Sequence, residues 1–110
     1  MAKDDYHVVV FRILKYLYQQ LKKGLPVEPE MLLPDSKTCK VNETYWRYII
    51  ISMQEKGLIK GLEKGEGEPY AQLEAQLKDI QITPDGIDLL SDSKMSDKVD
   101  QLIKGILSIG

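Results

Sequence analysis

The sequence contains few of the residues from which catalytic and metal sites are built. It has one cysteine, Cys39, and one histidine, His7, in 110 residues. A single cysteine excludes an intramolecular disulfide framework. One cysteine and one histidine cannot supply the four ligands of a usual structural zinc site. The signatures of phosphate-binding loops, dinucleotide-binding folds and serine hydrolases are also missing. We therefore expect no metal, no cofactor and no enzymatic activity, with His7 a structural histidine and Cys39 a small residue of a polar turn.

The sequence also lacks an excess of one charge and a long apolar run. The formal net charge is -2, so any binding to nucleic acid must be local. The apolar run near the N-terminus is interrupted by Arg12 and Lys15, which makes it too short for a signal peptide or a membrane span. We expect a single cytoplasmic domain over residues 1–110 that does not contact a membrane.

Helical spacing of apolar residues dominates the first half of the chain. It predicts a first helix over 6–23 and a short second helix over 28–33, which a proline opens and Pro34 stops. A polar turn then leads to a third helix that is capped by Asn42 and ends at Gly57. Its expected buried stripe consists of Trp46, Ile49, Ile50 and Met53.

The second half of the chain alternates between strand and helix signals. Residues 57–62 and 78–83 predict two strands. In 70–78, apolar residues recur both at strand alternation and at helical spacing; composition favours a helix and the hairpin context favours a long strand, which is the reading we prefer. Thr83 and Pro84 should start a fourth helix that ends near Ser91. Beyond it, an apolar seam at heptad-like spacing predicts a last helix; its members are Met95, Val99, Leu102, Ile106 and Ile109.

This order of elements resembles a winged helix-turn-helix domain, an α+β, mostly α fold with a three-helix core and a two-stranded wing. The stretches MQEKGLIKG (53–61) and ITPDGIDLL (82–90) carry the resemblance, which covers about residues 6–91. An additional C-terminal helix follows over about 95–109. The size, the long wing and the added helix are similar to the YjcQ-like family of small bacterial and prophage proteins.

The resemblance implies a small transcriptional regulator of bacterial or phage origin that binds double-stranded DNA. The third helix, about 42–56, would enter the major groove. Lys37 and Lys40 would then contact phosphates. Thr44, Tyr45, Arg47 and Tyr48 would lie near bases or sugars.

The distribution of charged residues does not support DNA binding in every part of the predicted fold. The stretch GLEKGEGEPY (61–70), at the expected wing, carries Glu63, Glu66 and Glu68 against one lysine, so it should repel phosphate. The first helix is the most basic element, with Arg12, Lys15, Lys22 and Lys23. We interpret that face as the solvated side of an amphipathic helix; the alternative is a face that contacts the DNA backbone or a protein.

A protein-protein interaction module is the alternative function. It would use the acidic wing and an exposed face made by Tyr45, Tyr48 and Ile51, because aromatic residues are enriched in interface cores. The C-terminal seam, including Val99, Leu102 and Ile106, can either pack on the first helix of the same chain or form a homodimer.

Overall fold

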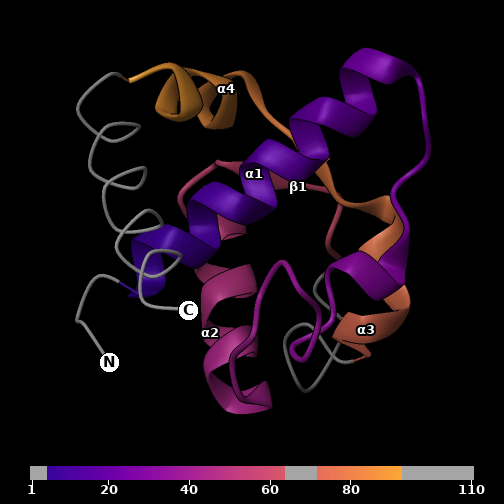
Figure 1. The fold of residues 1–110 in the computed structure, drawn as a ribbon, viewed down its shortest axis with the longest axis vertical. Helices are drawn as coiled ribbons and strands as arrows, with labels where there is room; N and C mark the ends of the chain where they lie inside the picture. Colours follow the sequence, from indigo (N-terminus) through magenta and orange to yellow (C-terminus); the bar gives the residue numbers. More distant parts are fainter. Residues whose placement is uncertain (1–4, 64–71, 93–110) are drawn as a thin grey trace.

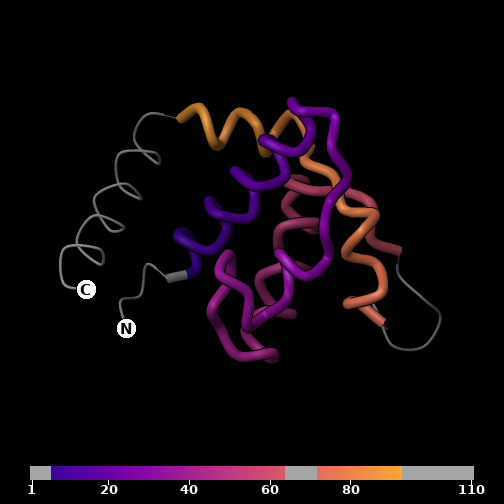
Figure 2. The backbone as a smooth tube through the Cα atoms, turned by 45° about the vertical axis from the view of Figure 1, so that its right-hand side comes forward, coloured from indigo at the N-terminus to yellow at the C-terminus, as the bar shows by residue number. Residues whose placement is uncertain are grey.

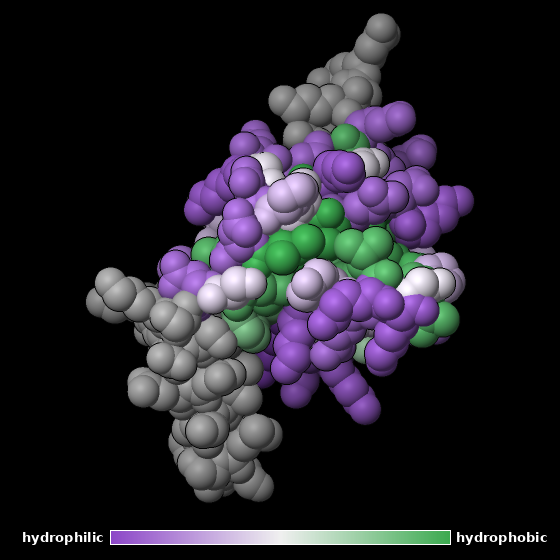
Figure 3. Space-filling view, turned by 90° about the horizontal axis from the view of Figure 1, so that it is seen from above, coloured by the Kyte–Doolittle hydropathy of each residue, from purple (hydrophilic) through white to green (hydrophobic). Residues whose placement is uncertain are grey.

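The computed structural model describes residues 5–63 and 72–92. This part of the chain contains four α-helices and two short 3-10 helices, together with one two-stranded antiparallel sheet (Figure 1). The α+β, mostly helical class expected from the sequence is therefore confirmed. Seen from the side where α4 and the end of α1 lie, hydrophobic residues form a band between hydrophilic ones (Figure 3).

The first helix, α1 (Asp5–Lys23), matches its predicted range and crosses the molecule diagonally (Figure 1). Its residues Val10, Ile13, Leu14 and Leu17 recur at helical spacing, and each is at most 4% exposed. After α1, the N–H of Gly24 bonds to the oxygen of Leu21 and the N–H of Leu25 to that of Gln20, at 3.1 and 2.9 Å. These bonds stop the helix and turn the chain back along it.

The second helix is much shorter than predicted. In place of a helix over 28–33, the structure has η1 (Pro29–Met31), a 3-10 helix closed by bonds from Met31 to Glu28 and from Leu32 to Pro29. A residue before proline avoids the α-helical conformation, and both Glu28 and Leu33 precede prolines. Only the four residues 29–32 lie between them, so this segment can form no more than about one helical turn.

The third predicted helix is present as α2 (Glu43–Glu55), and its four expected stripe residues are all fully buried. The side chain of Asn42 accepts the N–H of Tyr45 at 2.8 Å, as expected for a helix cap. Gly57 ends the helix with φ of 77°, a left-handed conformation that glycine adopts without strain. The N–H groups of Gly57 and Leu58 bond to the oxygens of Gln54 and Met53.

The two predicted strands pair, although each is short. Strand β1 (Ile59–Lys60) runs antiparallel to β2 (Gln81–Ile82), with Ile59 opposite Ile82. The next helix, α4 (Pro84–Ser91), starts at Thr83, whose hydroxyl accepts the N–H of Gly86 at 3.1 Å and donates to the oxygen of Gly57. The stretches 53–61 and 82–90 therefore meet at one hydrogen-bonded junction. Ile87, Leu89 and Leu90 pack partly buried on the core, as predicted.

The long wing strand predicted for 70–78 is wrong where the structure describes it. Residues 73–79 form α3 (Leu73–Gln76) followed by η2 (Leu77–Asp79), also a 3-10 helix. Leu73, Leu77 and Ile80 are each at most 1% exposed, so the helical period of apolar residues prevails over their alternation.

Several predicted features lie outside the described residues. These are most of the wing tip with Glu66 and Glu68, and the C-terminal seam with Val99, Leu102 and Ile106. Within the described ranges, none of the helices combines the length and apolar character needed to span a bilayer.

Replacing Gly86 by alanine should destabilise the fold by roughly 1–3 kcal/mol, because overpacking forces neighbours apart. A Cβ there would press on the backbone oxygen of Leu58 and lie 2.8 Å from Cγ1 of Ile82. Thermal and urea unfolding measure the change. Ser91→Ala, at an exposed position of the same helix, should stay within about 0.5 kcal/mol of the wild type. Equal stability of the two variants would contradict the close packing at Gly86.

Candidate nucleic-acid interface

A groove with several cations lies between α1 and the turn that precedes α2. It has a volume of about 270 Å³ and is lined by Arg12, Lys15, Tyr16, Gln19, Lys37 and Thr38. The four α1 residues follow helical spacing and therefore share one face of the helix. We call these six residues the basic groove. Three of them are cations and none is a carboxylate.

The cations of the basic groove are accessible to a ligand. Lys15 and Lys37 are exposed, and Arg12 is half-buried. Within 5–63 and 72–92, no carboxylate forms an ion pair with any of the three. Cations that are not already paired can neutralise phosphates without first breaking an internal contact.

The turn that carries Lys37 is anchored to α2 through one backbone oxygen. The indole N–H of Trp46 donates to the oxygen of Leu32 at 2.7 Å, and the thiol of Cys39 donates to the same oxygen at 3.6 Å. Trp46 is fully buried, so this contact lies inside the core. Within the turn, the N–H of Lys40 bonds to the oxygen of Ser36 at 3.0 Å. The backbone positions of Lys37 and Lys40 are therefore held relative to α2.

Cys39 is a core residue, and not the small residue of a polar turn that the sequence suggested. It is 1% exposed and belongs to the main hydrophobic cluster. Burial raises the pKa of its thiol, although the hydrogen bond with Ser36 and the charge of Arg12 act in the opposite direction. The polar residues around Cys39 in the sequence concealed this role, because the turn folds its thiol inward.

The outward face of α2 carries the residues predicted to lie near bases. Thr44 and Tyr48 are exposed, while Tyr45 and Arg47 are half-buried. Tyr48 is 65% exposed, and its ring lies edge-on to that of Tyr6 with centroids 6.3 Å apart. Tyr45 packs partly against the core, so it contributes less to the outer surface than Tyr48 does.

The basic groove itself was missed in the sequence. The sequence placed Arg12 and Lys15 on the basic face of the first helix, and this face was interpreted mainly as solvated. The structure shows that the turn packs beside it and adds Lys37. No local pattern could reveal this pairing, because it depends on how a turn is folded against a distant helix.

The remaining candidate groups are peripheral to the groove. Glu63 is exposed, and its backbone N–H donates to the side-chain oxygen of Gln76 at 2.6 Å. His7 is half-buried with its ring edge-on to Tyr6 at 5.4 Å, consistent with a structural histidine. In the described part of the chain, no three histidine, cysteine, aspartate or glutamate side chains gather in a way that could hold a metal ion.

These features describe a small, mostly helical protein with a short antiparallel hairpin and a basic groove beside the turn before α2. The family model described as "YjcQ protein" matches residues 11–109. The chain therefore belongs to the YjcQ family, and the family resemblance seen in the sequence is confirmed. A search of curated proteins and a search of solved structures each found no match.

Cys39 should react with iodoacetamide much more slowly in the native protein than in the urea-unfolded chain at the same pH. The thiolate is the reacting species, and burial both raises the pKa of the thiol and blocks access to it. Mass spectrometry of the alkylated fraction over time measures the difference. Equal rates in the two states would contradict the burial of Cys39.

Proposed function

We propose that this protein binds double-stranded DNA as a small transcriptional regulator with a winged-helix arrangement. In this proposal α2 enters the major groove and the basic groove faces the phosphate backbone. The proposal rests on one observation: Lys37, in the turn that leads into α2, shares a groove with Arg12 and Lys15, and no carboxylate lines it. Such a cluster is the electrostatic footprint expected of a protein that contacts phosphates.

The order of elements supports the winged-helix arrangement. Helix α1 is followed by a bonded turn, α2, the β1–β2 hairpin and α4. Two features depart from it, because η1 stands where a second helix was expected and α3 lies between the strands. In the proposed arrangement the anchored turn would stand in for the second helix, since its Leu32 oxygen bonds to Trp46 in the first turns of α2.

The proposed roles follow from position on this scaffold. Lys15 and Lys37 would neutralise phosphates, together with half-buried Arg12 of the same groove. Lys40 would contact the backbone from the end of the turn. Arg47 and Tyr48, with Thr44, would lie against base edges and sugars. The protein acts here by binding, with no catalytic step and no cofactor.

Changing Lys15 and Lys37 to glutamine together should weaken DNA binding and lower the salt slope, d log K/d log[salt], by about two units in magnitude. Each phosphate contact contributes roughly one unit to that slope. Fluorescence anisotropy with a pool of duplex DNA fragments, measured across a salt series, provides the test. Lys60→Gln with Lys78→Gln is the matched control, because it removes two exposed lysines outside the basic groove and alters the net charge equally.

The control pair should retain both the affinity and the salt slope of the wild type. If the wild type binds no duplex even at low salt, the DNA-binding proposal fails. Equal losses in the two pairs would show that overall charge, and not the basic groove, governs binding.

The exposed ring of Tyr48 favours a second candidate function, in which α2 contacts a protein partner. It is one of the few exposed large apolar side chains in the described part of the chain, and half-buried Ile51 lies one turn further along the helix. Such residues concentrate in interface cores. If this candidate is right, Tyr48→Ser should abolish cross-linking to a host protein that the wild type captures, while Glu55→Gln should retain it. Loss of duplex affinity in Tyr48→Ser with unchanged capture would instead place Tyr48 at the DNA.

A further inference from the structure

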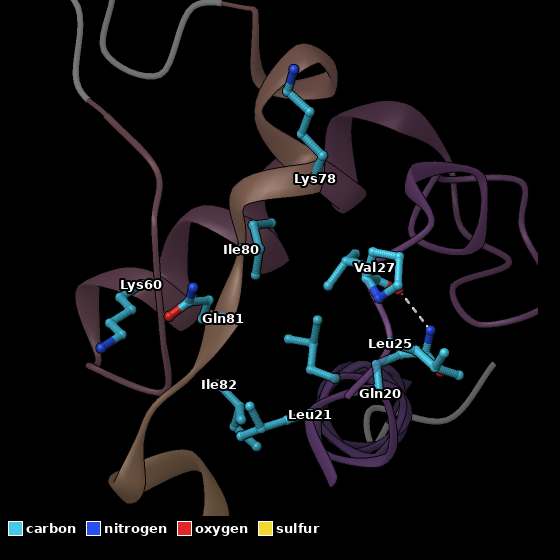
Figure 4. Close-up of a pocket in the computed structure, with 11 residues that line it drawn as sticks. Gln20, Leu21, Leu25, Val27, Lys60, Lys78, Ile80, Gln81 and Ile82 are labelled. Atoms are coloured by element: carbon cyan, nitrogen blue, oxygen red, sulfur yellow. Dashed lines mark hydrogen bonds between the residues drawn. The ribbon is translucent and has the colours of Figure 1, made fainter. Parts of the chain in front are cut away.

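A second groove lies beside the C-terminal half of α1. It occupies about 410 Å³ between the last turns of α1, the segment 25–27 and the residues of β2 (Figure 4). Its floor is formed by Leu17, Ile80 and Ile82, which are at most 6% exposed. Leu21 and Leu25 line it while remaining 59% and 53% exposed. We call this cavity the apolar groove.

The wall of the apolar groove on the 25–27 side is held in place by α1. The N–H of Leu25 bonds to the oxygen of Gln20 at 2.9 Å, and the side-chain amide of Gln20 donates to the oxygen of Pro26 at 2.7 Å (Figure 4). One residue past this segment, the N–H of Glu28 donates to the hydroxyl of Tyr16 at 2.9 Å. Because these bonds fix the segment against α1, Leu25 and Val27 are presented to the groove before any ligand arrives.

The groove remains open because this segment does not join the sheet. It runs beside the residues that lead into β2 in both views of the chain (Figures 1 and 2), yet the sheet of the described residues contains only β1 and β2. Pro26 has no N–H to offer a neighbouring strand. Val27 and Ile80 line opposite sides of the groove (Figure 4).

The charged residues at the apolar groove all have the same sign. Lys60 and Lys78 line it, and no carboxylate does. Both lysine side chains are exposed and lead away from Ile80 toward the outside (Figure 4). Their long, flexible stems can bring the ammonium groups to the mouth of the groove, whereas the floor offers only apolar contacts.

We propose that the apolar groove binds a small aliphatic carboxylate, with its hydrocarbon chain on the floor and its carboxylate at the mouth beside Lys60 and Lys78. The cavity volume falls within the roughly 300–1,000 Å³ typical of small-molecule sites. The apolar floor favours binding of the ligand's hydrocarbon chain, and the two lysine ammonium groups favour its anionic head group. This site is separate from the basic groove, and the proposal does not depend on DNA binding.

Decanoate is the probe for the test, with decanol and decylamine as comparisons of matched chain length. In ¹H–¹⁵N spectra, decanoate should produce saturable shifts at the amides of Leu21, Leu25, Ile80 and Ile82. The affinity of straight-chain carboxylates should rise about fourfold for each methylene added from hexanoate to octanoate. Each added methylene buries a similar amount of apolar surface and so adds a similar binding free energy. Decanol should bind about tenfold more weakly than decanoate, because it lacks the charge-assisted contact.

Two pairs of substitutions separate the roles of charge and apolar surface. Lys60→Gln with Lys78→Gln should weaken decanoate binding about tenfold and leave decanol binding unchanged. Leu21→Gln with Leu25→Gln should weaken both ligands. All four residues are exposed, so thermal unfolding should show that the variants fold. Lys15→Gln with Lys37→Gln is the charge-matched control and should bind decanoate as the wild type does.

Three results would overturn the proposal. The first is the absence of saturable shifts up to the solubility limit of decanoate. The second is binding of decanol or decylamine as tight as that of decanoate, which would remove the role of the lysines. The third is an equal effect of the two lysine pairs, which would assign the binding to overall charge.

Discussion

The backbone oxygen of Leu32 is the contact on which the arrangement around α2 depends. It accepts the indole N–H of Trp46 and the thiol of Cys39, and both donors are almost completely buried. A buried carbonyl that lost these donors would carry the full cost of desolvation, so the turn cannot easily leave the helix. Because the turn is held there, Lys37 stays beside α1. The position of Lys37 in the proposed DNA interface therefore depends on an interaction in the core.

The junction between α2, the β1–β2 strands and α4 also depends on a small number of contacts. A single hydroxyl, that of Thr83, joins the end of one helix at Gly57 to the start of another at Gly86. The absence of a side chain at Gly86 lets α4 approach the backbone of Leu58. The two sequence stretches that suggested the fold are thus the two sides of one contact.

Local signals in the sequence predicted most of the fold. Helix ends are marked by Asn42, Gly57 and Thr83 through their own hydrogen bonds or backbone angles. The start and end of α2 and the start of α4 could therefore be predicted from the sequence. Prediction failed for 28–33, where two prolines limit the segment to one short turn, and for 70–78, where helical and alternating spacings of apolar residues compete. The candidate site was less predictable. Its individual cations were recognised, but their grouping depends on which distant surfaces meet, and Cys39 turned inward against the polarity of its neighbours.

Tyr16 belongs to both surfaces of α1. Its ring lines the basic groove, and its hydroxyl accepts the N–H of Glu28, directly after the segment that walls the apolar groove. A single side chain therefore contributes to one groove directly and to the other through the backbone that it holds. The phenol joins the two faces of α1 by one hydrogen bond at the surface, with no contact through the core.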